Sequence, residues 1–247
     1  MKRRLGFAIL ASLVALPALA GDRIAYAVNG KPFEGYFASA GKNAITVVIL
    51  PTWNGISDYE KDRAQMLADE GYNAFAADLH GEGNLPKTME DKQSAHDALF
   101  AARPELHAML RSAIGKAQGL GGGKIVLLGY SMGGGAAMEL VRSGLGSELG
   151  VAGYAVFSGR VTDPENRMIP EGIAPIFVAH GAEDRRVPGS GLRNFADDLD
   201  LAGVEHTIEI YPGAGHLFSA FGFPNYDQQT ERRSWAALLK FLGGLAD

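Results

Sequence analysis

Short apolar runs alternate with longer helical stretches along the chain after residue 21. The run AITVVIL at 44–50 is apolar throughout, except for one threonine, which is typical of a strand buried on both faces. Such runs predict strands over 24–28, 33–38, 44–50, 74–79, 124–130, 151–157, 174–180 and 206–211. The longer stretches predict helices over 57–70, 88–118, 132–143, 192–201 and 227–242.

Turn and capping residues mark the limits of several of these elements. Asn29-Gly30 separates the first two runs and is a strong signal for a hairpin turn. Ser57, with Glu60 three residues later, has the capping-box pattern that begins a helix. Pro104 predicts a break inside the long helical region after residue 88. Gly119 to Gly123 predicts a glycine-rich loop before the next strand.

The order of the elements predicts the fold class. Strands that alternate with helices are typical of a mostly parallel sheet with helices on both faces, here with an antiparallel hairpin at its start. No linker, repeat or shift in composition divides the chain, and hydrophobic residues make up 47% of it, enough for a full core. We therefore expect a single α/β domain over residues 21–247.

The first twenty residues have the pattern of a secretory signal peptide. Residues 2–4 are basic, and Leu5 to Leu16 form an uncharged apolar stretch. Ala18-Leu19-Ala20 then supplies the small-x-small pattern that a signal peptidase cleaves. The apolar stretch is too short to span a bilayer, which needs about 20 residues. We expect cleavage after Ala20, a periplasmic or secreted protein, and no membrane attachment after cleavage.

Composition excludes several functional classes. Without residues 1–20 the chain holds 20 Lys and Arg against 28 Asp and Glu, a formal charge of −8. No basic cluster follows Arg4, so neither nucleic acid nor an anionic membrane is an expected partner. The absence of cysteine removes a thiol nucleophile and every cysteine-based metal site. His80 and Glu82 have no accompanying ligand set, and no cofactor motif appears, so we expect neither metal nor cofactor.

A nucleophile motif follows the strand at 124–130. Gly129-Tyr130-Ser131-Met132-Gly133 fits G-x-S-x-G, in which a serine sits on a strained strand-to-helix turn. An apolar strand ends at this motif and a helical stretch begins at Met132, the setting that the motif requires. The motif therefore predicts the α/β-hydrolase fold, with Ser131 as nucleophile. The alternative is a phosphate-binding turn at a helix N-terminus, but no Walker lysine follows.

A nucleophilic serine needs a histidine as base and a carboxylate to hold that histidine. In this fold the chain order is nucleophile, acid, histidine. Asp184 follows the strand at 174–180, and His216 follows the strand at 206–211. Because parallel strands end at the same edge of a sheet, both should lie beside Ser131. Ser131, Asp184 and His216 are therefore the predicted catalytic triad.

Other residues compete for the acid and base roles. Asp163 follows the strand at 151–157 and is an alternative candidate for the acid of the triad. Glu183, adjacent to Asp184, is another. The remaining histidines either lie at strand ends or precede the serine: His80, His96, His107, His180 and His206. The oxyanion hole should combine the backbone amides of Met132 and Trp53, the latter in the loop after strand 44–50.

These residues together resemble the dienelactone hydrolase family over about residues 44–241. The resemblance is carried by Trp53-Asn54-Gly55, Asp58-Tyr59, Arg63, Ala77 to Gly83, Gly129 to Gly134, His180 to Asp184, and Arg232 to Trp235. The family commonly has cysteine at the nucleophile and a glutamate before the oxyanion-hole residue. This chain has Ser131 and Thr52 at these two positions. The two changes agree, because a serine has no thiol proton for a glutamate to accept. Its prototypes also carry a substrate-binding arginine four residues past the histidine, where this chain has Ala220.

The resemblance and the triad imply hydrolysis of a small-molecule carboxylic ester or lactone through an acyl-enzyme on Ser131. His216 would act as base and then acid, Asp184 would orient it, and the Trp53 and Met132 amides would bind the oxyanion. Two alternatives remain open at this point. The same triad could serve an acyltransferase, or the fold could belong to a non-catalytic binding module.

Overall fold

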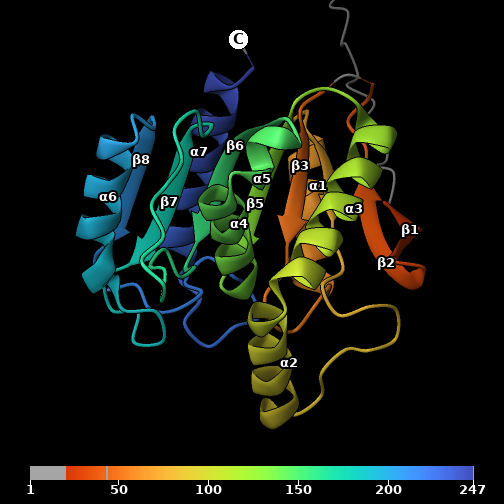
Figure 1. Cartoon of the computed structure of the whole chain (residues 1–247), viewed down its shortest axis with the longest axis horizontal. Coiled ribbons are helices and arrows are strands. Elements are labelled where there is room, and N and C mark those ends of the chain that lie inside the picture. Colours follow the sequence, from red (N-terminus) through yellow and green to blue (C-terminus); the bar gives the residue numbers. More distant parts are fainter. Residues whose placement is uncertain (1–20, 43, 247) are drawn as a thin grey trace, which may run out of the picture.

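The computed structural model describes residues 21–42 and 44–246. The predicted signal peptide, residues 1–20, lies outside the described residues. None of the helices in the described ranges is long and apolar enough to cross a membrane. The described chain forms one central sheet between two layers of helices (Figure 1).

The sheet has eight strands in the order β1-β2-β4-β3-β5-β6-β7-β8. Their bounds are β1 Asp22–Val28, β2 Lys31–Ala38, β3 Thr46–Leu50, β4 Asn73–Ala76, β5 Ile125–Tyr130, β6 Val151–Phe157, β7 Ile176–Gly181 and β8 His206–Tyr211. The β1–β2 and β2–β4 pairs are antiparallel, whereas β4, β3 and β5 to β8 run parallel. All parallel strands therefore end at the same edge, the lower one in Figure 1.

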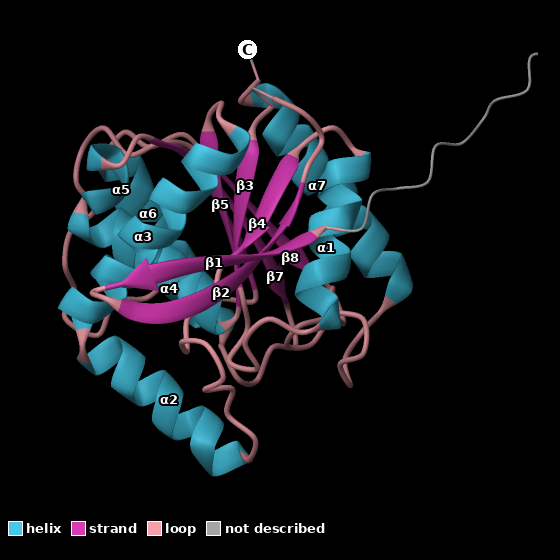
Figure 2. Cartoon of the chain, turned by 90° about the vertical axis from the view of Figure 1, so that its right-hand side faces the viewer, coloured by secondary structure: helices cyan, strands magenta, loops and turns pink. Residues whose placement is uncertain are grey.

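Helices cover both faces of the sheet (Figure 2). Their bounds are α1 Asp58–Asp69, α2 Met89–Ala101, α3 Arg103–Gly121, α4 Met132–Ser143, α5 Leu145–Glu148, the 3₁₀ turn η1 Gly189–Gly191, α6 Leu192–Leu201 and α7 Gln228–Gly244. Apolar side chains of α3, α4 and α6 join one core, and those of α1 and α7 join the core on the opposite face. Helix α2 extends beyond the carboxyl edge of the sheet. The predicted mostly parallel sheet with helices on both faces is confirmed.

Local signals in the sequence account for most element limits. Asn29 and Gly30 both have positive φ, 48° and 77°, as the hairpin turn between β1 and β2 requires. The Glu60 carboxylate accepts a hydrogen bond from the Ser57 amide at 2.9 Å, so the capping box forms. Pro104 lies in the first turn of α3, where its missing N–H has no intrahelical role. The predicted hairpin, helix start and break are confirmed.

The predicted glycine-rich loop over 119–123 is wrong in its first half. Helix α3 continues through Gly121, and only Gly122 and Gly123 have positive φ. The helix packs closely on β3 at this point, because a Cβ at Gly121 would lie 2.2 Å from Thr46 Oγ1. Packing against the sheet therefore outweighs the low helix propensity of glycine.

A buried arginine joins α1, α7 and the loop after β8. The Arg63 side chain is 1% exposed and pairs with Glu231 at 2.8 Å. Its Nη2 also donates to the Ser219 carbonyl at 2.7 Å, three residues past His216. Aromatic rings surround the guanidinium, among them Trp235 with its ring centroid at 4.7 Å. This cluster ties the loop that carries His216 to both helices on one face of the sheet.

We expect Arg63→Met to lower the free energy of unfolding by about 3–5 kcal/mol, because it leaves the Glu231 carboxylate buried without its partner. Lys61→Met is the matched control. Lys61 pairs with Asp58, and their side chains are 35% and 95% exposed, so this ion pair should contribute less than about 1 kcal/mol to stability. Chemical denaturation measures both changes. Equal, small losses in the two variants would show that the Arg63 cluster does not hold the fold together.

Candidate active site

Ser131 lies on a sharp turn between β5 and α4. Its φ of 52° and ψ of −108° are strained for a residue with a side chain. The Ser131 amide donates to the Phe157 carbonyl at 2.9 Å and holds the turn at the end of β6. Glycine is required next to it, because a Cβ at Gly133 would lie 2.0 Å from the Leu50 carbonyl oxygen. The turn thus presents the Ser131 hydroxyl at the carboxyl edge of the sheet.

The structure brings together the three residues of the predicted triad. Ser131 Oγ lies 3.0 Å from His216 Nε2, and His216 Nδ1 lies 2.8 Å from Asp184 Oδ2. The Asp184 side chain is fully buried and that of His216 is 11% exposed. The residues follow β5, β7 and β8, so 85 residues separate the serine from the histidine that it contacts. The parallel order of the strands produces this contact.

Hydrogen bonds keep Asp184 ionised. Burial acts to raise the pKa of its carboxyl, but hydrogen bonds from His216 and from the Val187 amide outweigh burial, so the pKa lies below its usual value. Its Oδ1 accepts from the amides of Arg186 and Val187 at 3.0 and 2.8 Å. A carboxylate can only accept, so a neutral His216 donates its Nδ1 proton to Asp184. His216 Nε2 is then free to accept from the Ser131 hydroxyl.

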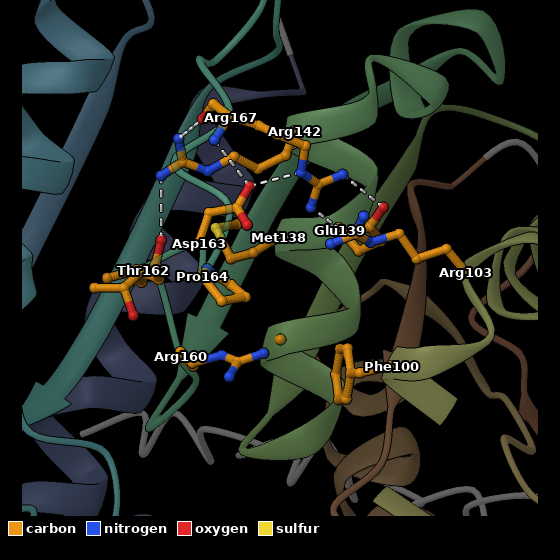
Figure 3. Close-up of a pocket in the computed structure, with 12 residues that line it drawn as sticks. Phe100, Arg103, Met138, Glu139, Arg142, Arg160, Thr162, Asp163, Pro164 and Arg167 are labelled. Atoms are coloured by element: carbon orange, nitrogen blue, oxygen red, sulfur yellow. Dashed lines mark hydrogen bonds and ion pairs between the residues drawn. The ribbon is translucent and has the colours of Figure 1, made fainter. Parts of the chain in front are cut away.

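Asp163, the competing acid, lies away from His216. Its carboxylate pairs with Arg167 at 2.7 Å and accepts from the Glu165 amide at 3.0 Å. Figure 3 shows the Asp163 carboxylate directed at Arg167 in a pocket beside α4. Burial acts to raise its pKa, but the Glu165 amide and the Arg167 guanidinium lower it. Asp163 therefore belongs to an ion-pair network, which also includes Glu139.

The other competing residues have contacts of their own. His180 Nε2 lies 2.9 Å from the carbonyl of Val187, the residue whose amide holds Asp184. Burial lowers the pKa of His180, so the ring is neutral and donates to that carbonyl. Glu183 is exposed. The remaining histidines contact other groups, namely the Trp53 carbonyl for His80, Asp97 for His96, Glu139 for His107 and the Val204 carbonyl for His206.

The two residues predicted to form the oxyanion hole, Trp53 and Met132, line the same pocket as Ser131. Met132 is the first residue of α4, where an amide has no intrahelical acceptor. Trp53 lies in the loop after β3, and the Gly133 amide joins this loop to α4 by donating to the Pro51 carbonyl at 3.0 Å. Within the described part of the chain, no backbone acceptor takes a hydrogen bond from Trp53 or Met132 in this region. Both amides therefore remain available for a ligand.

The sequence did not indicate the contact between Glu60 and the oxyanion loop. Thr52 is fully buried, and its amide donates to Glu60 Oε1 at 3.4 Å. Burial raises the pKa of the Glu60 carboxyl, although hydrogen bonds from Ser57 and Thr52 act to lower it. A carboxyl group thus lies behind the loop even though the family glutamate is replaced by Thr52. The capping pattern predicted the helix start, but only the folded loop brings Thr52 to Glu60.

The model of the dienelactone hydrolase family matches residues 33–245. The chain belongs to the dienelactone hydrolase family. The match extends from β2 to α7, so the resemblance that the motifs indicated over a shorter range is confirmed. The α/β-hydrolase fold of the dienelactone hydrolase family agrees with the observed sheet and helix layers. This membership makes the chain a hydrolase.

Relatives in the dienelactone hydrolase family match along most of their length. The carboxymethylenebutenolidase of Pseudomonas putida is 24% identical, and the match covers 80% of this chain and 85% of the relative. The solved structure named m3DLH is 27% identical, has a TM-score of 0.79 and covers 92% of this chain and 99% of its own. The dienelactone hydrolase-like promiscuous phosphotriesterase P91 from metagenomic libraries is 24% identical, with a TM-score of 0.79 and coverage of 91% and 98%.

Proposed function

We propose that the chain hydrolyses carboxylic esters or lactones through an acyl-enzyme on Ser131. The observation that carries this proposal is the hydrogen-bonded series Ser131–His216–Asp184 at one edge of the sheet. The two amides of Trp53 and Met132 add the donors that a tetrahedral oxyanion needs. The name of the Pseudomonas putida relative, which denotes action on a butenolide, a lactone, supports the same substrate class.

The first half of the reaction forms the acyl-enzyme. Ser131 Oγ attacks the carbonyl carbon while its proton passes to His216 Nε2, and the carbonyl electron pair moves to the oxygen. The amides of Trp53 and Met132 bind this oxyanion, and ionised Asp184 stabilises the imidazolium. The tetrahedral species collapses, the bond to the alcohol oxygen breaks, and His216 gives its proton to that oxygen. The acyl group remains on Ser131, while the alcohol leaves when the substrate is an ester and stays attached to the acyl group when it is a lactone.

The second half regenerates the enzyme. Water attacks the acyl carbon and gives its proton to His216 Nε2, and the same two amides bind the new oxyanion. Collapse breaks the bond to Ser131 Oγ, which takes the proton back from His216. The products are one carboxylic acid and one alcohol, or one hydroxy acid when the substrate is a lactone. His216 is charged only transiently, and every residue has regained its initial charge at the end of the cycle.

Pre-steady-state hydrolysis of p-nitrophenyl acetate tests this proposal. We expect a burst of about one p-nitrophenolate per active site, because the good leaving group makes deacylation slower than acylation. Acid quenching during the burst should leave an acetyl group on the Ser131 peptide, found by mass spectrometry. Turnover without a burst and without an adduct would contradict the acyl-enzyme. Methanol added as acceptor separates the alternatives, since methyl acetate as the main product would indicate an acyltransferase.

We also propose that the protein is exported and begins at Gly21 after cleavage. The Gly21 nitrogen donates to the Tyr36 hydroxyl at 2.8 Å, so the first residue after the predicted cleavage site already contacts β2. N-terminal sequencing of the protein from a periplasmic fraction should start at Gly21. A protein that retains Met1 and stays in the cytoplasm would contradict export.

A further inference from the structure

Two hollows open on different members of the proposed triad. A pocket of about 240 Å³ borders Ser131, and Trp53 and Met132 also line it. An open cleft of about 720 Å³ borders His216 and is lined by Glu183, Arg185, Arg186, Gly213, Gly215 and Asn225. Arg186 is the one residue that lines both hollows. Ser131 therefore borders the smaller pocket, and His216 borders the open cleft.

The chemistry of the reaction assigns a part of the substrate to each hollow. The carbonyl oxygen must point to the amides of Trp53 and Met132, two residues that line the smaller pocket. His216 Nε2 must give its proton to the alcohol oxygen as the bond from that oxygen to the acyl carbon breaks, so the alcohol lies on the side of His216. We propose that the pocket holds the acyl group and the cleft holds the alcohol. The preferred substrates are then acyclic esters of compact acids with large, polar alcohols, a refinement that rests on the proposed function.

Three residues divide the acyl pocket from a neighbouring pocket. The Arg160 guanidinium lies over the Phe100 ring, 5.6 Å from its centroid, and Figure 3 shows the Arg160 side chain directed toward this ring. Gly135 is the third residue of the group. These three residues line both the acyl pocket and the ion-pair pocket that contains Asp163, so they form the wall between them. A cavity of 150 Å³ holds benzene, so 240 Å³ has room for roughly ten non-hydrogen atoms.

Arg186 separates the two hollows. Its guanidinium lies 4.7 Å from the centroid of the Trp53 ring, and its amide donates to Asp184. The cleft beyond it offers the charged side chains of Glu183 and Arg185 and the amide of Asn225. Among the described residues, no large apolar side chain lines this cleft, so an alkyl alcohol would meet glycine backbone and the stems of polar side chains there. An alcohol with several hydroxyl groups could instead form hydrogen bonds with these side chains.

Two matched series of esters test the assignment. In p-nitrophenyl esters with acyl chains of two, four and twelve carbons, kcat/KM should fall at least about tenfold between four and twelve carbons, because the longest chain exceeds the room in the pocket. In acetate esters, the 6-O-acetyl ester of methyl glucoside should exceed octyl acetate by at least about tenfold in kcat/KM. Equal rates for the four- and twelve-carbon acyl chains, or a preference for octyl acetate, would overturn the assignment.

Two variants show which hollow serves which group. Phe100→Ala opens the wall of the acyl pocket and should raise the twelve- to four-carbon ratio about tenfold without changing the ratio between the two acetates. Arg185→Leu makes the cleft less polar and should shift the acetate ratio toward octyl acetate without changing the acyl ratio. The reverse pattern would exchange the two assignments and refute the proposal. Absence of p-nitrophenyl acetate hydrolysis by the wild type would instead refute the proposed function itself.

Discussion

Ser131→Ala should lower kcat for ester hydrolysis by about 10⁶-fold. The variant loses the atom that attacks the carbonyl, and a methyl group cannot pass a proton to His216. The fold should persist, because the turn is held by the Ser131 amide and the glycines around it, which the substitution leaves in place. The loss should therefore appear in kcat, with the thermal unfolding temperature little changed.

A fluorophosphonate probe gives an independent measurement of the same role. The wild type should be labelled at Ser131, and the Ser131→Ala variant should not be labelled at all. Ser143→Ala is the matched control, since Ser143 lies at the other end of α4 and its hydroxyl contacts only the neighbouring turn. It should be labelled at the wild-type rate. Persistent labelling of Ser131→Ala would mean that another residue is the nucleophile.

Asp184→Asn should lower kcat by about 10⁴-fold. An asparagine amide can donate to His216 Nδ1, which would place the imidazole proton on Nε2 and prevent that atom from accepting the proton of Ser131. The hydrogen bonds from the Arg186 and Val187 amides can still reach the side-chain oxygen, so the loop should keep its shape. Steady-state kinetics at a pH where the wild type is fully active measures the effect.

Asp163→Asn is the control for the assignment of the acid. This carboxylate pairs with Arg167, so the change should lower stability while kcat stays within about tenfold of the wild type. Assays below the unfolding range of both variants separate stability from catalysis. A large loss of kcat in Asp163→Asn together with a small loss in Asp184→Asn would show that Asp163, after β6, is the acid of the triad.

Local chemistry accounts for what the sequence predicted well. The Asn29-Gly30 turn, the Ser57–Glu60 cap and the apolar strands depend on interactions within a few residues, so their pattern is visible along the chain. The chain order of Ser131, Asp184 and His216 was also informative, because parallel strands bring their carboxyl ends to one edge whatever the details of packing. Local signals were insufficient at the end of α3, where contact with β3 extends the helix over residues with low helix propensity.

The sequence by itself determined the fold class, the family and three candidates for a triad in the right order. Only the tertiary structure decided that Asp184, and not Asp163, contacts His216, since both follow strands and carry the same group. It also decided the contacts of Arg63 with Ser219 and of Glu60 with Thr52, as well as the two hollows beside the serine and the histidine. These features depend on loops that meet from distant parts of the chain. Their geometry is set by the packing of whole elements, which no local pattern of residues encodes.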